Sequence, residues 1–269
     1  MRTLSLHHLT MIAAHPLELV EAAAVGGFDH CGIRLVAPMR TDRIVDVLAD
    51  PGLVRQVGQR LRATGVRLLD IEAIWLQPDT HVGALMPALE VGREWGAQHV
   101  LVVGNDTDHS RLLDNFGRLC EAAGRLQLNV GLEFITYCSI GTLDQARALV
   151  TQSGQPNACL LIDALQFFRS GASSDQLRDV DAGLLRYMQI CDGPRVGPVS
   201  LQMRRHEART ARLLPGEGEL PIAELIKAAP NGIPLSLEAP TVALASLSFN
   251  DQARIAGDVT RRFLAGIGV

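Results

Sequence analysis

The sequence predicts an α/β fold in which eight strands alternate with helices, a single (β/α)8 TIM barrel over residues 1–269. Three observations support this prediction. Eight short apolar runs recur along the chain, stretches with apolar residues three and four positions apart lie between them, and 269 residues suit one barrel of this kind. A doubly wound open sheet is the main alternative, but no GxGxxG motif follows the first apolar run.

The predicted strands are spaced so that helices can connect them on the outside of a barrel. In chain order they are Leu4–His8, Cys31–Val36, Val66–Ile74, His99–Val103, Asn129–Phe134, Ala158–Asp163, Tyr187–Cys191 and Ile233–Glu238.

Helical spacing of apolar residues appears between these runs. Thr142 stands in the N-cap position of a predicted helix that continues with Leu143. Pro221 falls in the first turn of another, before Ile222, where its missing donor costs little. The remaining predicted helices are Pro16–Val25, Leu85–Trp95 and Arg111–Leu126.

The composition disfavours several classes of protein. Charges of both signs are interspersed and the net charge is −4, so no nucleic-acid partner is expected. Five cysteines without a CxxC pair indicate neither a disulfide framework nor a thiolate zinc site. No apolar run reaches the ~20 residues that span a bilayer, and the N-terminus lacks a secretion signal. We therefore expect a soluble, unprocessed, cytoplasmic protein without a membrane partner.

Four oxygen-bearing side chains stand at or near the ends of successive strands in the second half of the chain. Glu133, Asp163 and Glu238 close three of these strands, and Gln189 lies in a fourth. Active sites of such barrels form where the strands end. Carboxylate and amide oxygens are hard ligands that suit a divalent metal, so the pattern predicts one metal ion, with Mg²⁺ or Mn²⁺ favoured.

A purely structural role is the alternative for these side chains. A single carboxylate at a strand end is commonly a helix N-cap or the partner of a nearby arginine. Three buried carboxylates together need a neutralising cation, because like charges raise one another's pKa. That cation is a metal ion or an arginine, and Arg169, Arg195 and Arg209 are the candidates considered for an arginine-filled pocket.

The chain also resembles a known family over essentially its whole length. The resemblance is to the xylose-isomerase-like TIM barrels, the sugar phosphate isomerase/epimerase superfamily. The segments that carry it, in order, are VGLEF, LLIDALQFFRSG, YMQICDGPR, RLLPGEGELP and LSLEAP.

The resemblance implies a site around one divalent metal. Glu133, Asp163 and Glu238 would be ligands, and Glu133 and Glu238 would also move protons. Gln189 occupies a ligand position where many members have His, and Gln166 replaces the His of the DxxH motif. Glutamine offers an oxygen but cannot titrate near neutral pH. A Gln at that ligand position is similar to some bacterial 3-dehydroshikimate dehydratases, and Zn²⁺ or Co²⁺ stays open as the metal.

The implied activity is a metal-dependent isomerase/epimerase of carbohydrate metabolism that abstracts a proton next to a carbonyl of a small polyhydroxy substrate. The alternative is a metal-dependent dehydratase (lyase) of the 3-dehydroshikimate or inosose type. An endonuclease-type barrel and a non-catalytic barrel are weaker alternatives, and homo-oligomerisation stays open.

Further side chains are predicted to contact the substrate. Two adjacent histidines end the first strand, and alternation places one in the barrel mouth; His8 is preferred over His7. Glu72 is expected at the mouth too, where an ion pair with Arg34 is its structural alternative. Gln166, Arg195 and Arg209 complete the predicted set, with Arg209 or Arg212 as an anion clamp.

Overall fold

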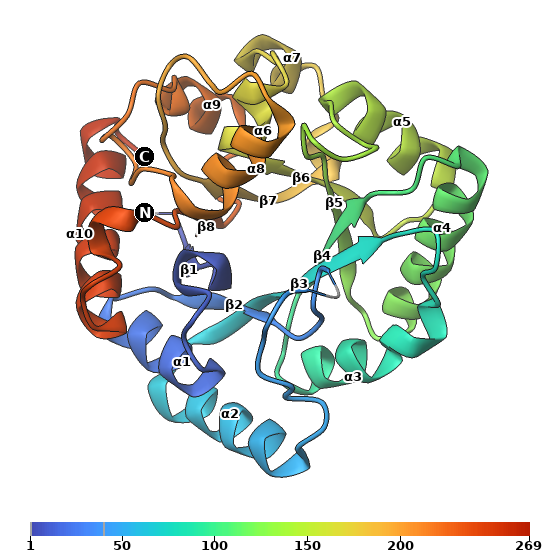
Figure 1. Cartoon of the computed structure of the whole chain (residues 1–269), viewed down its shortest axis with the longest axis horizontal. Helices are drawn as coiled ribbons and strands as arrows, with labels where there is room; N and C mark the ends of the chain where they lie inside the picture. The colour runs from blue at the N-terminus through green and yellow to red at the C-terminus, as the bar shows by residue number, and fades with distance from the viewer. Residues whose placement is uncertain (1, 40) are drawn as a thin grey trace.

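Eight parallel strands close into one barrel in chain order, β1 to β8 (Figure 1). The computed structural model describes residues 2–39 and 41–269. The predicted fold class is therefore confirmed. The strands are β1 Leu4–Leu6, β2 His30–Arg34, β3 Arg67–Leu76, β4 His99–Gly104, β5 Asn129–Glu133, β6 Ala158–Asp163, β7 Leu185–Ile190 and β8 Leu235–Leu237.

Helices surround the barrel on the outside (Figure 1). The α-helices are α1 Pro16–Val25, α2 Pro51–Thr64, α3 Met86–Glu94, α4 His109–Arg125, α5 Leu143–Ser153, α6 Ala164–Arg169, α7 Ser174–Arg178, α8 Leu201–Thr210, α9 Ile222–Ala228 and α10 Phe249–Gly266. Four short 3-10 helices join them within the described residues: η1 His8–Met11, η2 Val82–Leu85, η3 Ala182–Leu184 and η4 Val242–Leu244.

Local sequence signals explain where several helices begin and end. The bounds of α1 match the prediction, and His15 caps this helix. The Thr142 hydroxyl accepts a hydrogen bond from the Gln145 N–H and caps α5, as predicted, while Gly154 ends α5 in a left-handed conformation. Pro221 was predicted to lie in the first turn of a helix. The helix α9 starts one residue later, at Ile222, and Pro221 is its N-cap.

The first strand is shorter than predicted. It ends at Leu6, because the His7 side chain accepts a hydrogen bond from the Leu9 N–H and starts the 3-10 helix η1 at His8. The chain therefore turns two residues before the predicted end of this strand, which changes the histidine that faces the barrel mouth.

Apolar side chains fill two regions. The larger core lies between the barrel and its helices. The smaller cluster contains Leu69, Ala73, Leu101, Val103, Ile135, Leu161 and Tyr187. Polar groups are buried close to it: the Tyr187 hydroxyl donates to Asp70 Oδ2 at 2.9 Å. A side chain at Gly32 would clash with the carboxylate oxygens of Asp70 and Glu72, so this part of the barrel is tightly filled.

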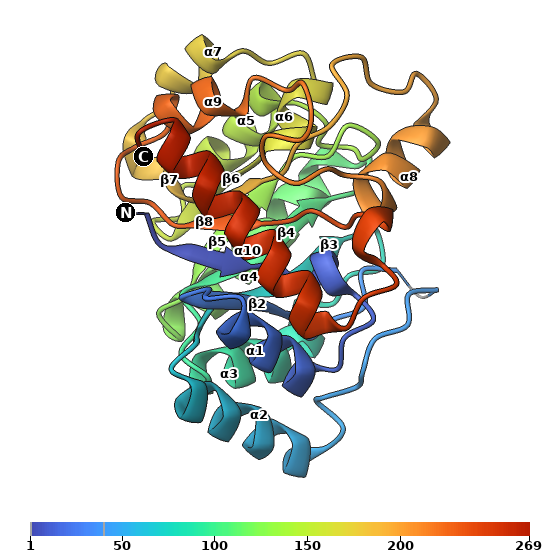
Figure 2. The same cartoon turned by 90° about the vertical axis from the view of Figure 1, so that its left-hand side faces the viewer.

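The two termini lie together at one end of the barrel, and α8 lies toward the other end (Figure 2). The strands run away from the termini, so their carboxyl ends open beneath the segment that carries α8. Within residues 2–39 and 41–269, no helix has the length and apolar character needed to cross a membrane.

Candidate active site

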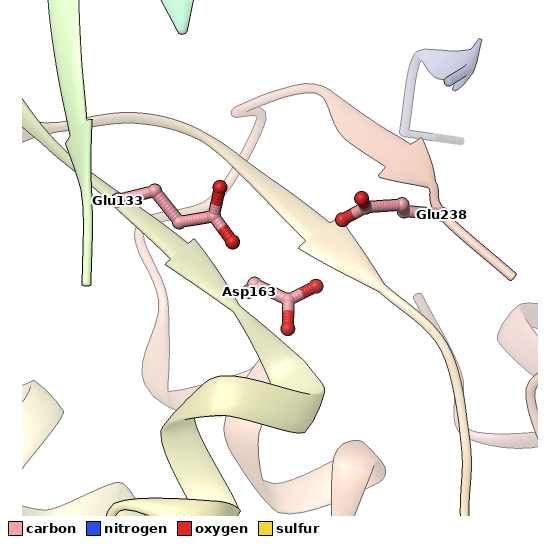
Figure 3. A group of neighbouring side chains, drawn as sticks. All are labelled: Glu133, Asp163 and Glu238. Atoms are coloured by element: carbon pink, nitrogen blue, oxygen red, sulfur yellow. The ribbon is translucent and has the colours of Figure 1, made fainter. Parts of the chain in front are cut away.

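Three carboxylates meet where the strands end. Glu133 is the last residue of β5, Asp163 is the last of β6, and Glu238 directly follows β8. Their side chains point toward one another (Figure 3), and one oxygen from each lies within 4.8 Å of the others. All three are buried. We call Glu133, Asp163 and Glu238 the carboxylate triad.

The parallel register explains why these positions converge. Asp163 pairs with Gln189 on β7, and Gln189 pairs with Ser236 on β8. Side chains alternate along a strand, so Glu238 lies two residues beyond Ser236 on the same face. Asp163 also has the predicted structural role, because its Oδ1 accepts the Gln166 N–H at 2.8 Å and caps α6.

Arg212 enters the triad from the segment after α8. Its Nη1 lies 2.5 Å from Asp163 Oδ2 and 3.3 Å from Glu238 Oε2, and the side chain is buried. An isolated bridge between Asp192 and Leu213 holds this segment beside the end of β7. Sequence patterns do not predict this contact, because Arg212 is distant along the chain from both carboxylates.

The arginines considered for this neutralising role lie elsewhere. Arg169 pairs with Glu207 at 2.6 Å and Arg209 pairs with Asp42 at 2.9 Å. Arg195 is exposed. Among the described residues, Arg212 contacts the triad and none of these three arginines does.

Two buried arginines, Arg212 in contact and Arg34 farther away in the pocket wall, do not balance three carboxylates. Burial raises the pKa of Glu133 well above its ordinary value, and the charges of Glu238 and Asp163 raise it further. Burial also raises the pKa of Glu238 to about 8, although Arg212 opposes that rise. These carboxyls hold protons unless more positive charge is supplied. The triad therefore fits a divalent cation, which would supply that charge.

Gln189 could add a fourth oxygen. It is fully buried, and among the described residues neither its amide oxygen nor its amide nitrogen has a hydrogen-bond partner. An unpaired buried amide is costly, so a partner for that oxygen would stabilise the site. Its role as a metal ligand stays a prediction.

A small cavity of about 30 Å³ opens beside the triad. Gln166 and Arg209 line it, and their contact with a substrate stays a prediction. Gln166 is held in place because its Oε1 accepts the Thr136 N–H at 3.1 Å. The rest of the wall comprises His7, Leu9, Arg34, Pro38, Ala73, Trp75, Leu101, Glu133, Ile135, Tyr137, Ala208, Arg212 and Glu238. We call this space the central pocket.

The preference for His8 in the barrel mouth is wrong. His7 lines the central pocket, with Nε2 3.3 Å from Glu72 Oε2 and Nδ1 3.7 Å from Glu238 Oε1. His8 is turned away from the pocket: its Nδ1 accepts the Arg34 N–H, and its Nε2 contacts the Ala14 carbonyl at 3.1 Å. The cause is the early end of β1.

Two more predicted contacts lie outside the described pocket wall. Glu72 is buried behind it, where Oε1 accepts the His8 N–H at 3.0 Å and Oε2 lies 3.8 Å from Arg34 Nη2. That ion pair is its predicted structural alternative. Arg195 lies on the surface, and its backbone N–H donates to Glu219 Oε2 at 3.2 Å.

Fold and site together define a barrel with an oxygen-rich pocket at its mouth. The sequence profile of the xylose isomerase-like TIM barrel family matches residues 20–260, and the chain belongs to this family.

Similar proteins include enzymes of more than one kind. A 3-dehydroshikimate dehydratase of Pseudomonas putida is 26% identical over 219 residues, which are 77% of this chain but 32% of that protein. The chain thus spans about a third of the length of this relative.

Two solved structures share the fold. The IOLI protein with a bound zinc atom has a TM-score of 0.77 and 17% identity, with 98% of this chain and 97% of that one covered. A D-allulose 3-epimerase from Methylomonas sp. has a TM-score of 0.71 and 15% identity, with 99% and 98% covered.

Proposed function

We propose that this protein is a divalent-metal-dependent enzyme that moves a proton next to a carbonyl group of a small polyhydroxy substrate. The observation that carries the proposal is the buried carboxylate triad, whose charge Arg212 and the more distant Arg34 leave incompletely balanced. Isomerisation or epimerisation is the first candidate reaction, because two glutamates of the triad line the same pocket.

The metal would be held by Glu133, Asp163 and Glu238, with the amide oxygen of Gln189 as a fourth ligand. When bound, a divalent cation polarises a substrate carbonyl and stabilises the negative charge that develops on its oxygen. An all-oxygen ligand set favours Mg²⁺ or Mn²⁺. The zinc in the IOLI relative keeps Zn²⁺ among the metals to be tested.

The side chains perform the proton transfer. A carboxylate oxygen of Glu133 or Glu238 takes the proton from the carbon next to the carbonyl, and the C–H electron pair moves to give an enolate. Return of a proton to the other face, or to the neighbouring carbon, gives the epimer or the isomer. Arg212 orients Asp163 and Glu238 through its two contacts and adds no proton of its own.

Dehydration is the second candidate, and the Pseudomonas relative favours it. The same proton abstraction would be followed by loss of a hydroxyl from the next carbon as water. This reaction needs one base and one acid, and Gln166 is unsuited to be the acid because its amide does not titrate. His7 lines the described pocket wall, but burial and the charges of Arg34 and Arg212 lower its pKa well below the ordinary value, which disfavours its protonated form as that acid.

The test is a substrate screen with the purified protein and added Mg²⁺ or Mn²⁺. Free ketoses, inososes and 3-dehydroshikimate would be incubated in D₂O and followed by NMR. Exchange of the proton next to the carbonyl is expected for a true substrate, with either isomer formation or water loss. The proposal fails if Glu238→Gln retains full activity on the substrate found.

A further inference from the structure

Arg34 is a buried cation in the wall of the central pocket. It is the last residue of β2, it is 4% exposed, and it lines the cavity together with Glu133 and Glu238. Within the described part of the chain, its Nε donor is buried without a hydrogen-bond partner. A buried guanidinium with unused donors is unfavourable unless an anion completes its environment.

The nearest carboxylate neutralises Arg34 poorly. Glu72 Oε2 lies 3.8 Å from Arg34 Nη2, which is too long for a hydrogen bond. Glu72 already accepts the His8 N–H with its other oxygen. Burial and the charge of Asp70 raise the pKa of Glu72 well above its ordinary value. Their long separation and the second contact of Glu72 leave the charge of Arg34 only weakly paired.

The other two arginines of the described pocket wall are already paired. Arg209 contacts Asp42 at 2.9 Å, and Arg212 contacts Asp163 at 2.5 Å. Both guanidinium groups donate hydrogen bonds to these carboxylates. Among the described arginines of this wall, Arg34 is therefore the one whose guanidinium donates no hydrogen bond to a carboxylate.

We propose that Arg34 binds a carboxylate group of the substrate, so that the enzyme acts on a small hydroxy or keto acid and not on a neutral sugar. The proposal rests on the proposed function, because the carbon that loses its proton would lie at the carboxylate triad. Arg34 is on β2 and Glu133 on β5, and the strands between them present Ala73, Trp75 and Leu101 to the pocket. The wall of the pocket is therefore apolar between two polar ends, Arg34 and the triad.

The chemistry of arginine favours a carboxylate as the bound group. The planar guanidinium presents paired donors that match two carboxylate oxygens, whereas a single hydroxyl accepts from one donor.

The experiment compares matched ligands in a binding assay that does not need turnover. Calorimetry would measure trans-4-hydroxycyclohexanecarboxylate, its carboxamide and cyclohexyl phosphate against the Mn²⁺-supplemented protein. The wild-type protein is expected to bind the carboxylate tenfold or more tightly than the amide. Arg34→Met should remove that preference, Arg34→Lys should keep part of it, and the exposed control Arg195→Met should leave it unchanged.

The inference is overturned if the wild-type protein binds carboxylate and amide equally, or if the preference survives in Arg34→Met. Arg34-dependent binding of the phosphate without the carboxylate also overturns it. These outcomes are separate from a failure of the proposed function. An Arg34-dependent carboxylate preference in a protein that catalyses no proton exchange refutes the enzyme and keeps the subsite. Rapid turnover of a neutral ketose by Arg34→Met keeps the proposed enzyme and refutes the carboxylate subsite.

Discussion

At the scale of single residues, Glu133 and Glu238 have the properties of tuned proton carriers. Both are buried, and burial raises the pKa of each above the ordinary value. An acid–base group is most effective when its pKa lies near the working pH. A bound cation would lower both pKa values again, so occupancy of the triad sets the charge of these glutamates.

Replacement of either glutamate by glutamine should abolish catalysis and leave the barrel folded. The amide keeps the size of the side chain but cannot accept the proton, so a loss of 10²-fold or more in turnover is expected. Turnover by NMR and the melting temperature by circular dichroism would be measured together. Glu121→Gln, on the exposed face of α4, is the matched control. Retained activity in both triad variants would contradict the assigned roles.

Gln189→His tests whether residue 189 is a ligand. Imidazole binds zinc more readily than an amide oxygen does, so the ratio of Zn²⁺ to Mg²⁺ affinity should rise in this variant. Competition for the metal with a coloured chelator would give both affinities. An unchanged ratio would show that the Gln189 side chain does not bind the ion.

The sequence predicted the convergence of side chains best where an acidic residue stands at the end of a predicted strand. The ends of predicted strands supplied all members of the carboxylate triad. The choice between His7 and His8 failed, because it depended on one residue of strand length and a local cap that ended β1 early. Arg212 was named only as a clamp over the mouth, because its contact depends on how a long connection folds back.

At the scale of elements, the connection between β7 and α9 forms part of the pocket wall. It contains α8 and the pocket residues Arg209 and Arg212. Asp192, near its start, binds backbone N–H groups at both ends of this connection. The carboxylate of Asp192 is buried and accepts N–H groups from Gly193, Gly216 and Leu220. A side chain at Gly218 would clash with that carboxylate and with the Gly193 carbonyl, so the PGEG turn is packed against Asp192.

Asp192→Ala should loosen this connection and displace Arg212. Three hydrogen bonds to a charged group are lost, so destabilisation on the order of 2–3 kcal/mol is expected. Urea unfolding would measure the stability, and amide hydrogen exchange would locate the change in residues 192–220. Asp114→Ala, on the exposed surface of α4, is the control. Wild-type exchange in this segment would contradict the assigned role of Asp192.

Elements with clear local signals were predicted best. The apolar runs located all eight strands, and the Thr142 cap placed the start of α5 correctly. Irregularities of strand pairing were not predicted, such as the register shifts between β3 and both of its neighbours. A bulge follows from packing between strands that are distant in sequence, so local periodicity does not contain it.

At the scale of the whole molecule, the barrel buries more negative than positive charge at its mouth. Deeper in the barrel, near the start of β3, burial raises the pKa of Asp70 to about 7. The closed barrel was predictable from eight alternations of strand and helix. The balance of charge inside it was not, because that depends on which side chains face one another after closure.

The metal-free protein should therefore lose stability as the pH rises from about 5 to 8.5. Glu238 binds its proton with a pKa of about 8 in the folded state, against an ordinary value of 4.5, so between these values the folded state holds more protons than the unfolded chain. Stability then falls with rising pH, and Asp70 adds to the fall below about pH 7.

Metal binding should oppose this loss and test the charge balance of the molecule as a whole. Mn²⁺ at 100 times its dissociation constant stabilises the folded state by about 2.7 kcal/mol, so the melting temperature should rise by several degrees and most at alkaline pH. Scanning calorimetry from pH 5 to 8.5, with chelator or Mn²⁺, would measure both effects. Asp70→Asn should reduce the pH slope and keep the response to metal, while Glu238→Gln should reduce both. A chelated protein whose melting temperature rises with pH would contradict the buried charge imbalance.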